Sequence, residues 1–216
     1  MRQPLGQTTK MKLYISAGSP YSRRARIARL EAGLENQIEE VNVINLPDRK
    51  ALLLEMGPGA MIPTLLLNNG TVLSESMVIN HYLDRISAGK LYPTDTLALE
   101  DCYRLEAIGA VLMDSLHTRS IQSRLDPDEQ SPTLLRKEVG RSGRCYNTLE
   151  SMLDLLTGQT HFSALTVAAS LSYADWRGAD DNWRESHPGL DAWMTEIERH
   201  PCICLLYTSP SPRDRG

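Results

Sequence analysis

The amino-acid sequence predicts an α/β domain followed by an all-helical domain. Strand and helix patterns alternate up to about residue 87. Residues 87–96 then form a linker that contains a glycine, a proline and several polar side chains. Beyond this linker only helical periodicity is found. We therefore expect one domain over residues 11–87 and a second over residues 97–201.

The composition excludes several classes of protein. No apolar run approaches the roughly 20 residues that a membrane-spanning helix needs, and the first ten residues lack the apolar core of a secretory signal. The net charge of −4 argues against nucleic acid as the main partner. The four cysteines lack the spacing of a zinc site, so we expect no metal and a reducing, cytoplasmic location.

The first half of the α/β domain reads as strand, helix, strand, helix. Lys12–Ser16 alternates like a strand, and Ser22–Gly33 has the apolar stripe of a helix with Ser22 as its N-cap. Ile38–Val43 is a second strand, and a short helix from Asn45 ends near Met56. Four arginines on the first helix are expected to form a solvated basic face: Arg23, Arg24, Arg26 and Arg29.

A hairpin and a helix complete this domain. Two β-prone segments, Thr64–Leu67 and Thr71–Leu73, flank Asn68-Asn69-Gly70, and Asn-Gly is the strongest short hairpin signal. Pro63 stands at the start of the first of these strands, where a missing N–H is tolerated. Ser74 is expected to cap the following helix. Its buried stripe is predicted to consist of Met77, Val78, Tyr82 and Ile86.

The C-terminal half contains helical patterns only. They cover Leu97–Ser123, Pro132–Leu156, Ala164–Arg177 and Pro188–Arg199. The third is apolar nearly all round, which predicts a buried central helix. The end segments, residues 1–10 and 202–216, show no matching pattern and are expected to lie outside the fold.

Glu75 and Ser76 fall in the first turn of the helix after the hairpin. A helix N-terminus has free N–H groups and a partial positive charge, which suit a carboxylate ligand. The Glu75 carboxylate could hold a cationic amine beside it. A ligand with both an α-carboxylate and an α-ammonium group would fit, and the γ-glutamyl end of glutathione is such a ligand.

The chain resembles the glutathione S-transferase family over roughly Met11–Pro201. The resemblance is carried by Pro63, followed twelve positions later by Glu75-Ser76 at a hairpin-to-helix step. It implies a thioredoxin-like N-terminal domain and an all-helical C-terminal domain. The stretch with Tyr173, Trp176-Arg177 and His187-Pro188 resembles a bacterial branch of the family.

The resemblance also implies roles for individual residues. Ser19, in the loop before the first helix, would be the catalytic residue, donating a hydrogen bond that favours the glutathione thiolate. Ser22 is the alternative for this role. Ile62 before a cis-Pro63 would contact the cysteinyl part of glutathione, and Glu75 and Ser76 would bind the γ-glutamyl part.

The expected function is conjugation of the glutathione thiolate to a small electrophile, a detoxifying reaction. Glutathione would be a co-substrate, with no further cofactor, and a homodimer is expected by analogy. Two alternatives remain: a non-catalytic binding module with the same fold, or a glutathione-dependent dehalogenase, isomerase or peroxidase.

Overall fold

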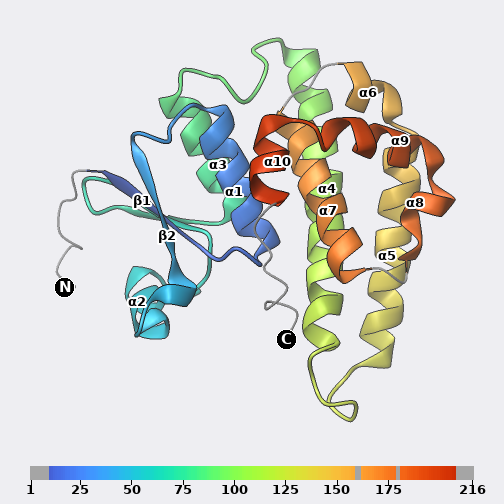
Figure 1. Ribbon diagram of the computed structural model, residues 1–216, viewed down its shortest axis with the longest axis horizontal. Coiled ribbons are helices and arrows are strands. Elements are labelled where there is room, and N and C mark those ends of the chain that lie inside the picture. The colour runs from blue at the N-terminus through green and yellow to red at the C-terminus, as the bar shows by residue number, and fades with distance from the viewer. Residues whose placement is uncertain (1–9, 159–161, 179–180, 208–216) are drawn as a thin grey trace. The chain divides into compact units, whose positions relative to one another are not determined.

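The computed structural model describes residues 10–158, 162–178 and 181–207 (Figure 1). The chain divides after Leu91 into two compact units, the second of which is Tyr92–Leu205. The first unit contains a mixed β-sheet with helices, and helices are the only regular elements in the described residues of the second. The predicted fold class, thioredoxin-like and then all-α, is confirmed.

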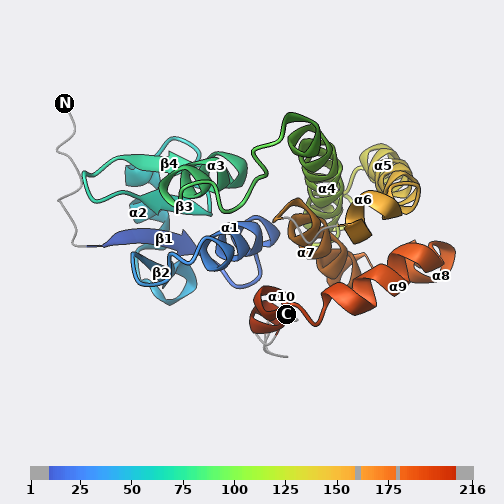
Figure 2. The same cartoon turned by 90° about the horizontal axis from the view of Figure 1, so that it is seen from above.

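The first unit has the expected order of strands and helices. Its elements are β1 (Met11–Ile15), α1 (Pro20–Glu31), β2 (Ile38–Asn42), the 3₁₀ turn η1 (Val43–Asn45), α2 (Arg49–Met56), β3 (Thr64–Leu66), β4 (Val72–Ser74) and α3 (Ser76–Ile86). The described strands form one sheet in the order β2-β1-β3-β4. β1 is parallel to β2, whereas β3 is antiparallel to both β1 and β4 (Figure 2).

Helices pack on both faces of this sheet. Tyr14 and Leu66 point to one face, where they join a buried cluster with Leu53 and Met56 of α2. Successive side chains of a strand alternate between faces, so Leu13 and its cross-strand partner Leu65 point to the other face. There the buried side chains of α1 and α3 complete the core, and these two helices lie side by side (Figure 2).

The start and the buried face of α3 differ from the prediction. Ser74 ends β4 and does not cap the helix; Glu75 occupies the N-cap position without a side-chain cap hydrogen bond. Met77 and Val78 are 36% and 51% exposed. The buried face consists of Ser76, Ile79, Asn80 and Leu83. Because α3 carries apolar residues on two faces, periodicity alone could not identify the one that meets the sheet.

The second unit is a set of helices around α4. Its elements are α4 (Thr96–Gln122), α5 (Pro132–Glu150), α6 (Leu153–Gly158), α7 (Phe162–Arg177), α8 (Trp183–Ser186), α9 (Pro188–Ile197) and α10 (Pro201–Tyr207). α4 packs along both α5 and α7 (Figure 1). None of the helices in the described part of the chain is both long and apolar enough to cross a membrane.

Two predicted boundaries change in this unit. The pattern over Pro132–Leu156 is divided between α5 and α6, with a break at Ser151 and Met152. Residues 202–207, expected to lie outside the fold, are part of α10, in which Cys202 and Ile203 are buried. Residues 1–9 and 208–216 of the expected end segments lie outside the described residues.

Helix α7 is the centre of the second unit, as its apolar composition predicts. All thirteen residues from Phe162 to Ala174 are buried. α7 approaches α4 closely at Gly109, where an added Cβ would lie 3.3 Å from the Cγ2 atom of Val167. This close packing explains why a glycine is accommodated in the middle of a long helix, where it costs about 1 kcal/mol relative to alanine.

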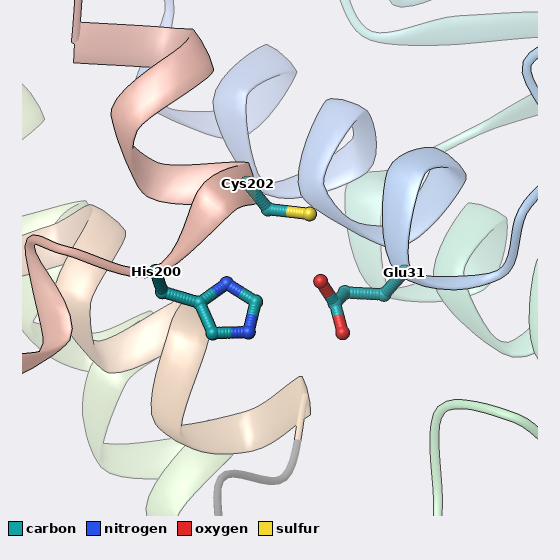
Figure 3. A group of neighbouring side chains, drawn as sticks. All are labelled: Glu31, His200 and Cys202. Atoms are coloured by element: carbon teal, nitrogen blue, oxygen red, sulfur yellow. The ribbon is translucent and has the colours of Figure 1, made fainter.

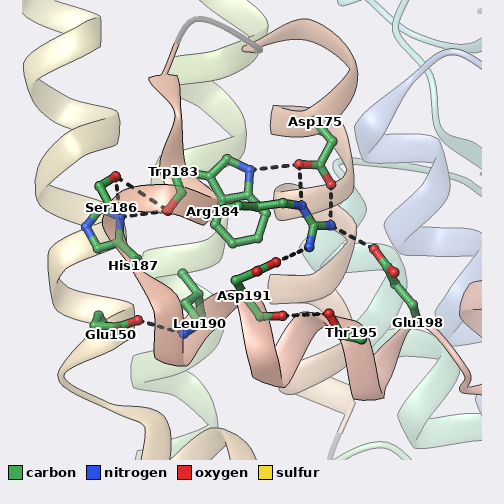
Figure 4. Close-up of polar contacts among 10 residues, drawn as sticks. All are labelled: Glu150, Asp175, Trp183, Arg184, Ser186, His187, Leu190, Asp191, Thr195 and Glu198. Carbon is green, nitrogen blue, oxygen red and sulfur yellow. Dashed lines mark hydrogen bonds and ion pairs between the residues drawn. The ribbon is translucent and has the colours of Figure 1, made fainter.

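A network of charged groups holds the segment after α7 (Figure 4). The guanidinium of Arg184 donates to both carboxylate oxygens of Asp175, at 3.0 and 2.7 Å. It also donates to Asp191 at 2.5 Å and to Glu198 at 2.8 Å. The indole N–H of Trp183 donates to Asp175 at 2.9 Å. α7, α8 and α9 are thus tied together through one side chain.

The N-terminus of α9 is capped by a side chain from another helix. The carboxylate of Glu150, at the end of α5, accepts hydrogen bonds from the backbone N–H groups of Gly189 at 2.9 Å and of Leu190 at 2.7 Å, the second of which is drawn in Figure 4. A Cβ on Gly189 would lie 2.8 Å from Oε1 of Glu150, so the glycine permits this approach. The negative charge also faces the positive end of the α9 dipole.

We predict that Glu150→Ala lowers the free energy of unfolding by about 1–2 kcal/mol, because two helix N–H groups lose a charged acceptor. Chemical denaturation followed by circular dichroism measures this change. The matched control is Glu196→Ala, because the carboxylate of Glu196 pairs with Arg199 on the surface. An exposed pair of that kind is worth about 0–1 kcal/mol. Equal losses in the two variants would contradict the capping role of Glu150.

Candidate functional site

The strand register brings the predicted site segments to one end of the sheet. Tyr14, near the end of β1, is opposite Thr64, which starts β3. Thr64 is in turn opposite Ser74, the last residue of β4. The loop that contains Ser19 follows the end of β1, the Ile62-Pro63 dipeptide leads into Thr64, and Glu75-Ser76 follows Ser74. They therefore lie at the same end of the sheet.

Ser19 is the N-cap of α1, a role the sequence had suggested for Ser22. Its hydroxyl oxygen accepts a hydrogen bond from the backbone N–H of Ser22 at 3.2 Å. Ser19 is half-buried, whereas Ser22 is fully buried and its own oxygen accepts from the backbone N–H of Ser16. Ser19 is thus the more accessible hydroxyl of the two, and its O–H can still donate to a ligand while the oxygen caps the helix.

Tyr14 lies in the core on the α2 face of the sheet, as expected for a strand residue. It is 8% exposed and packs with Val43, Leu53 and Met56. Burial raises the pKa of its phenol, and the nearby charge of Glu39 raises it further. The group is therefore protonated at neutral pH and belongs to the core.

The Ile62-Pro63 peptide bond is cis, as the resemblance implies. Pro63 is buried and Ile62 is half-buried, packed against the cluster on the α2 face. The segment is fixed locally by a hydrogen bond from the hydroxyl of Thr64 to the carbonyl oxygen of Met61, at 2.7 Å.

Glu75 makes the turn from β4 into α3 with a φ of 70°. A residue other than glycine in this region costs of order 1–3 kcal/mol, and such residues are concentrated at functional sites. Its side chain is exposed. Ser76 is the first residue of α3 and is only 4% exposed. The pair therefore presents an exposed carboxylate next to a helix N-terminus.

Arg24 is a residue that the sequence interpretation placed wrongly. It was expected on a solvated basic face, but it is 2% exposed and its Nη1 atom donates to the Oγ atom of Ser76 at 3.4 Å. Arg26 and Arg29 are also engaged, in ion pairs with Glu40 at 2.9 and 3.0 Å. One signal could have revealed the burial of Arg24: it lies one helical turn before Ala28 and Ile27, on the apolar side of α1.

Other groups that could bind a metal are few in the described residues. His200 directly precedes α10 and Cys202 is its second residue, whereas Glu31, also drawn in Figure 3, ends α1 in the other unit. The thiols Cys102, Cys145, Cys202 and Cys204 are all free. Burial raises the pKa of Cys102 and of Cys145, which makes both thiols less reactive.

Comparison with known proteins connects this geometry to a family. The family model described as glutathione S-transferase, N-terminal domain, matches residues 18–86. Glutathione S-transferase U22 of Arabidopsis thaliana is 38% identical over 79 residues, which cover 36% of this chain and 35% of that protein. The chain thus matches about a third of the length of such curated relatives.

Solved structures match over nearly the whole length. A glutathione transferase family member from Pseudomonas fluorescens Pf-5, solved with bound glutathione, is 30% identical with a TM-score of 0.83. The match covers 91% of this chain and 98% of that one. A structure of a family member from the same organism with bound S-(propanoic acid)-glutathione is 28% identical, with a TM-score of 0.79 and coverage of 91% and 96%. The chain therefore belongs to the glutathione S-transferase family.

Proposed function

We propose that this protein is a glutathione transferase that conjugates the glutathione thiolate to a small electrophile in the cytoplasm. The observation that supports this most strongly is the meeting of three segments at one end of the sheet: the Ser19 loop, Ile62-Pro63 and Glu75-Ser76. The family takes glutathione as a substrate and needs no additional cofactor.

In the proposed complex, each part of glutathione has a partner in the first unit. The γ-glutamyl carboxylate is bound by Ser76 and the N–H groups at the start of α3, and its ammonium group by the Glu75 carboxylate. The backbone of Ile62 pairs with the cysteinyl residue. The thiol sulfur then lies by the N-terminus of α1 and the Ser19 hydroxyl.

The chemical step needs a thiolate. A free thiol has a pKa of about 8.5, so only a few per cent is ionised at neutral pH. The Ser19 O–H and the positive end of α1 stabilise the anion, and each unit by which the pKa falls corresponds to about 1.4 kcal/mol. The thiolate attacks an electrophilic carbon, a C–S bond forms, and the electron pair passes to the leaving group or to the adjacent atom of a double bond. Binding both reactants together supplies the remaining acceleration.

We predict that Ser19→Ala raises the pKa of the thiol of bound glutathione by about 1–2 units. It should lower kcat at neutral pH about 10- to 100-fold, with a small change in KM. Thiolate absorbance against pH and conjugation of a chromogenic electrophile measure the two effects. Ser19→Asp keeps the helix cap but removes the donor and adds a negative charge, so it should be at least as impaired. Ser19→Thr keeps both cap and donor and should remain active.

Ser22→Ala is the comparison that separates the two serines, since Ser22 is fully buried. A large loss of kcat in Ser22→Ala with none in Ser19→Ala would reverse the assignment. Glutathione binding without turnover, unchanged by Ser19→Ala, would instead indicate the non-catalytic binding module. Turnover of a halide, an isomerisable bond or a peroxide in preference to conjugation would indicate one of the other glutathione-dependent reactions.

We predict that Glu75→Ala weakens glutathione binding about 10- to 100-fold, because the ligand's ammonium group loses a charged acceptor. Isothermal titration calorimetry measures the dissociation constant. Glu75→Gly should lose affinity equally while unfolding at the same or a higher temperature, since glycine adopts a φ of 70° without strain. Glu39→Ala, which removes an exposed carboxylate of β2, is the control and should bind normally. Unchanged binding in both Glu75 variants would refute the site.

We further propose that the protein is a homodimer. This is supported by the exposed face of α3, where Met77 and Ile86 are each 36% exposed and Val78 is 51% exposed. Exposed apolar side chains carried by one helix can form an association surface.

The Val78→Asp substitution tests this proposal. It should convert the dimer to a folded monomer, because it places a charge in an apolar contact. Analytical ultracentrifugation measures the mass. Val139→Asp, at a similarly exposed valine on α5, is the control. A wild-type monomer at high concentration, or an unchanged dimer in Val78→Asp, would contradict the proposed surface.

A further inference from the structure

Helices α4 and α7 pack side by side and run in the same direction, so their C-terminal ends lie together (Figure 1). About midway along both helices, the hydroxyl of Ser170 donates to the carbonyl oxygen of Gly109 at 2.9 Å. Further toward the C-termini, a Cβ built on Gly178 would lie 2.9 Å from the Cδ2 atom of Leu116. The later turns of two helices thus bring their side chains to one end of the second unit.

Three basic side chains meet at this end: His117 in α4, Arg124 just after α4, and Arg177 at the end of α7. We call them the basic cluster. Burial and then the charge of Arg124 lower the pKa of His117, with the charge of Asp114 opposing the shift. The same two causes, in the same order, lower the pKa of Arg177. Arg124 is therefore within electrostatic range of both other groups.

The two arginines of the basic cluster lack the carboxylate partners that neighbouring arginines have. Arg119 and Arg184 each form short ion pairs with carboxylates. Within the residues that the structure describes, neither Arg124 nor Arg177 is in an ion pair, although Arg124 donates to Oγ of Ser120 at 3.3 Å. The Nε atom of Arg177 is buried and has no hydrogen-bond partner in the same described residues. Neighbouring like charges without a counter-charge favour the binding of an anion.

An aromatic surface adjoins these charges. The Cζ atom of Arg177 lies over the ring of Trp176, 3.8 Å from its centroid, and both residues are half-buried. The Trp176 ring meets that of Tyr173 edge to face, and Ile121, one turn after His117, is 45% exposed. A guanidinium stacked by its face keeps its N–H groups for acceptors in its own plane. A helix C-terminus attracts a cation, but it does not require a second arginine or a stacked indole.

We propose that the basic cluster binds the carboxylate of an aromatic electrophile. Arg177 and Arg124 donate to the carboxylate, and Trp176 contacts the ring. The inference rests on the proposed function, in which the first unit supplies the partners of glutathione and the second reactant needs partners of its own. It names the substrate class: an aromatic acid in preference to a neutral compound of the same shape.

The test uses two electrophiles that differ in charge and hardly in shape. One is para-chloro-dinitrobenzoate, with both nitro groups beside the chlorine, and the other is the corresponding neutral benzamide. In each, the glutathione thiolate adds to the carbon that bears chlorine, a C–S bond forms, and the C–Cl bond breaks with its electron pair leaving as chloride. Each kcat/KM is divided by the uncatalysed rate constant with glutathione, which removes the difference in intrinsic reactivity.

Wild-type protein should favour the benzoate about tenfold by this normalised measure, and less so at high salt. Arg177→Gln should lower kcat/KM for the benzoate about tenfold and for the benzamide less than threefold, because only the benzoate loses a charged donor. Arg124 is exposed, so Arg124→Gln, with the same direction of change, keeps the test valid if Arg177→Gln folds poorly. Arg104→Gln removes an exposed arginine of α4 and is the control; it should keep the wild-type preference.

A binding measurement tests the basic cluster without turnover. The dinitrobenzoate that lacks chlorine cannot react, and a nitroaromatic ring quenches the fluorescence of an indole that it contacts. This compound should bind wild-type protein about tenfold more tightly than Arg177→Gln, whereas the matching benzamide should bind both equally. Trp176→Phe should lose most of the quenching, since Trp183 and Trp193 are buried.

The outcomes separate this inference from the proposed function. If glutathione binds but neither electrophile is conjugated, the proposed function is wrong. If both are conjugated with equal normalised efficiency, or if Arg177→Gln and Arg124→Gln lower both equally, the role of the basic cluster is refuted and the proposed function stands. Tight binding of the dinitrobenzoate without preference for the benzoate as a substrate also refutes the inference, because the anion is then not the electrophile.

Discussion

The site depends on the pairing of three consecutive partners across the sheet: Tyr14 with Thr64, and Thr64 with Ser74. β3 runs antiparallel to both of its neighbours, so its first residue is opposite the next-to-last residue of β1 and the last residue of β4. Three chain segments that are distant in sequence therefore leave or enter the sheet at the same end. A slip of one residue in either pairing would turn every side chain of the shifted strand to the other face.

The architecture of the first unit could be read from the sequence because its signals are local. Alternation identifies β1, and Asn69-Gly70 identifies the hairpin between β3 and β4. The buried face of α3 could not be read in the same way. Val78 and Ile79 are adjacent and equally apolar, yet one is 51% exposed and the other fully buried. That choice is made by packing against the sheet and α1, which periodicity does not encode.

The candidate site shows the same division. Ile62-Pro63 and Glu75-Ser76 could be singled out because a motif at fixed spacing identifies them, and Ser19 followed from the family resemblance that this motif carries. Arg24 could not, because four arginines within seven residues resemble a solvated surface. Its hydrogen bond to Ser76 joins two helices through tertiary structure, and the physical reason for its burial is visible only when both are in place. The choice of Ser19 over Ser22 as helix cap likewise needed the backbone course of the loop.

In the second unit, the complete burial of α7 from Phe162 to Ala174 constrains how the sequence can diverge. A change in volume at any of these positions must be absorbed by a neighbouring helix, since protein interiors are close-packed. At Val167 the neighbour is the backbone of α4 at Gly109, which has no side chain to shorten in compensation. Evolutionary drift in this helix should therefore be slow and correlated with α4, whereas the exposed positions of α5 are open to independent substitution.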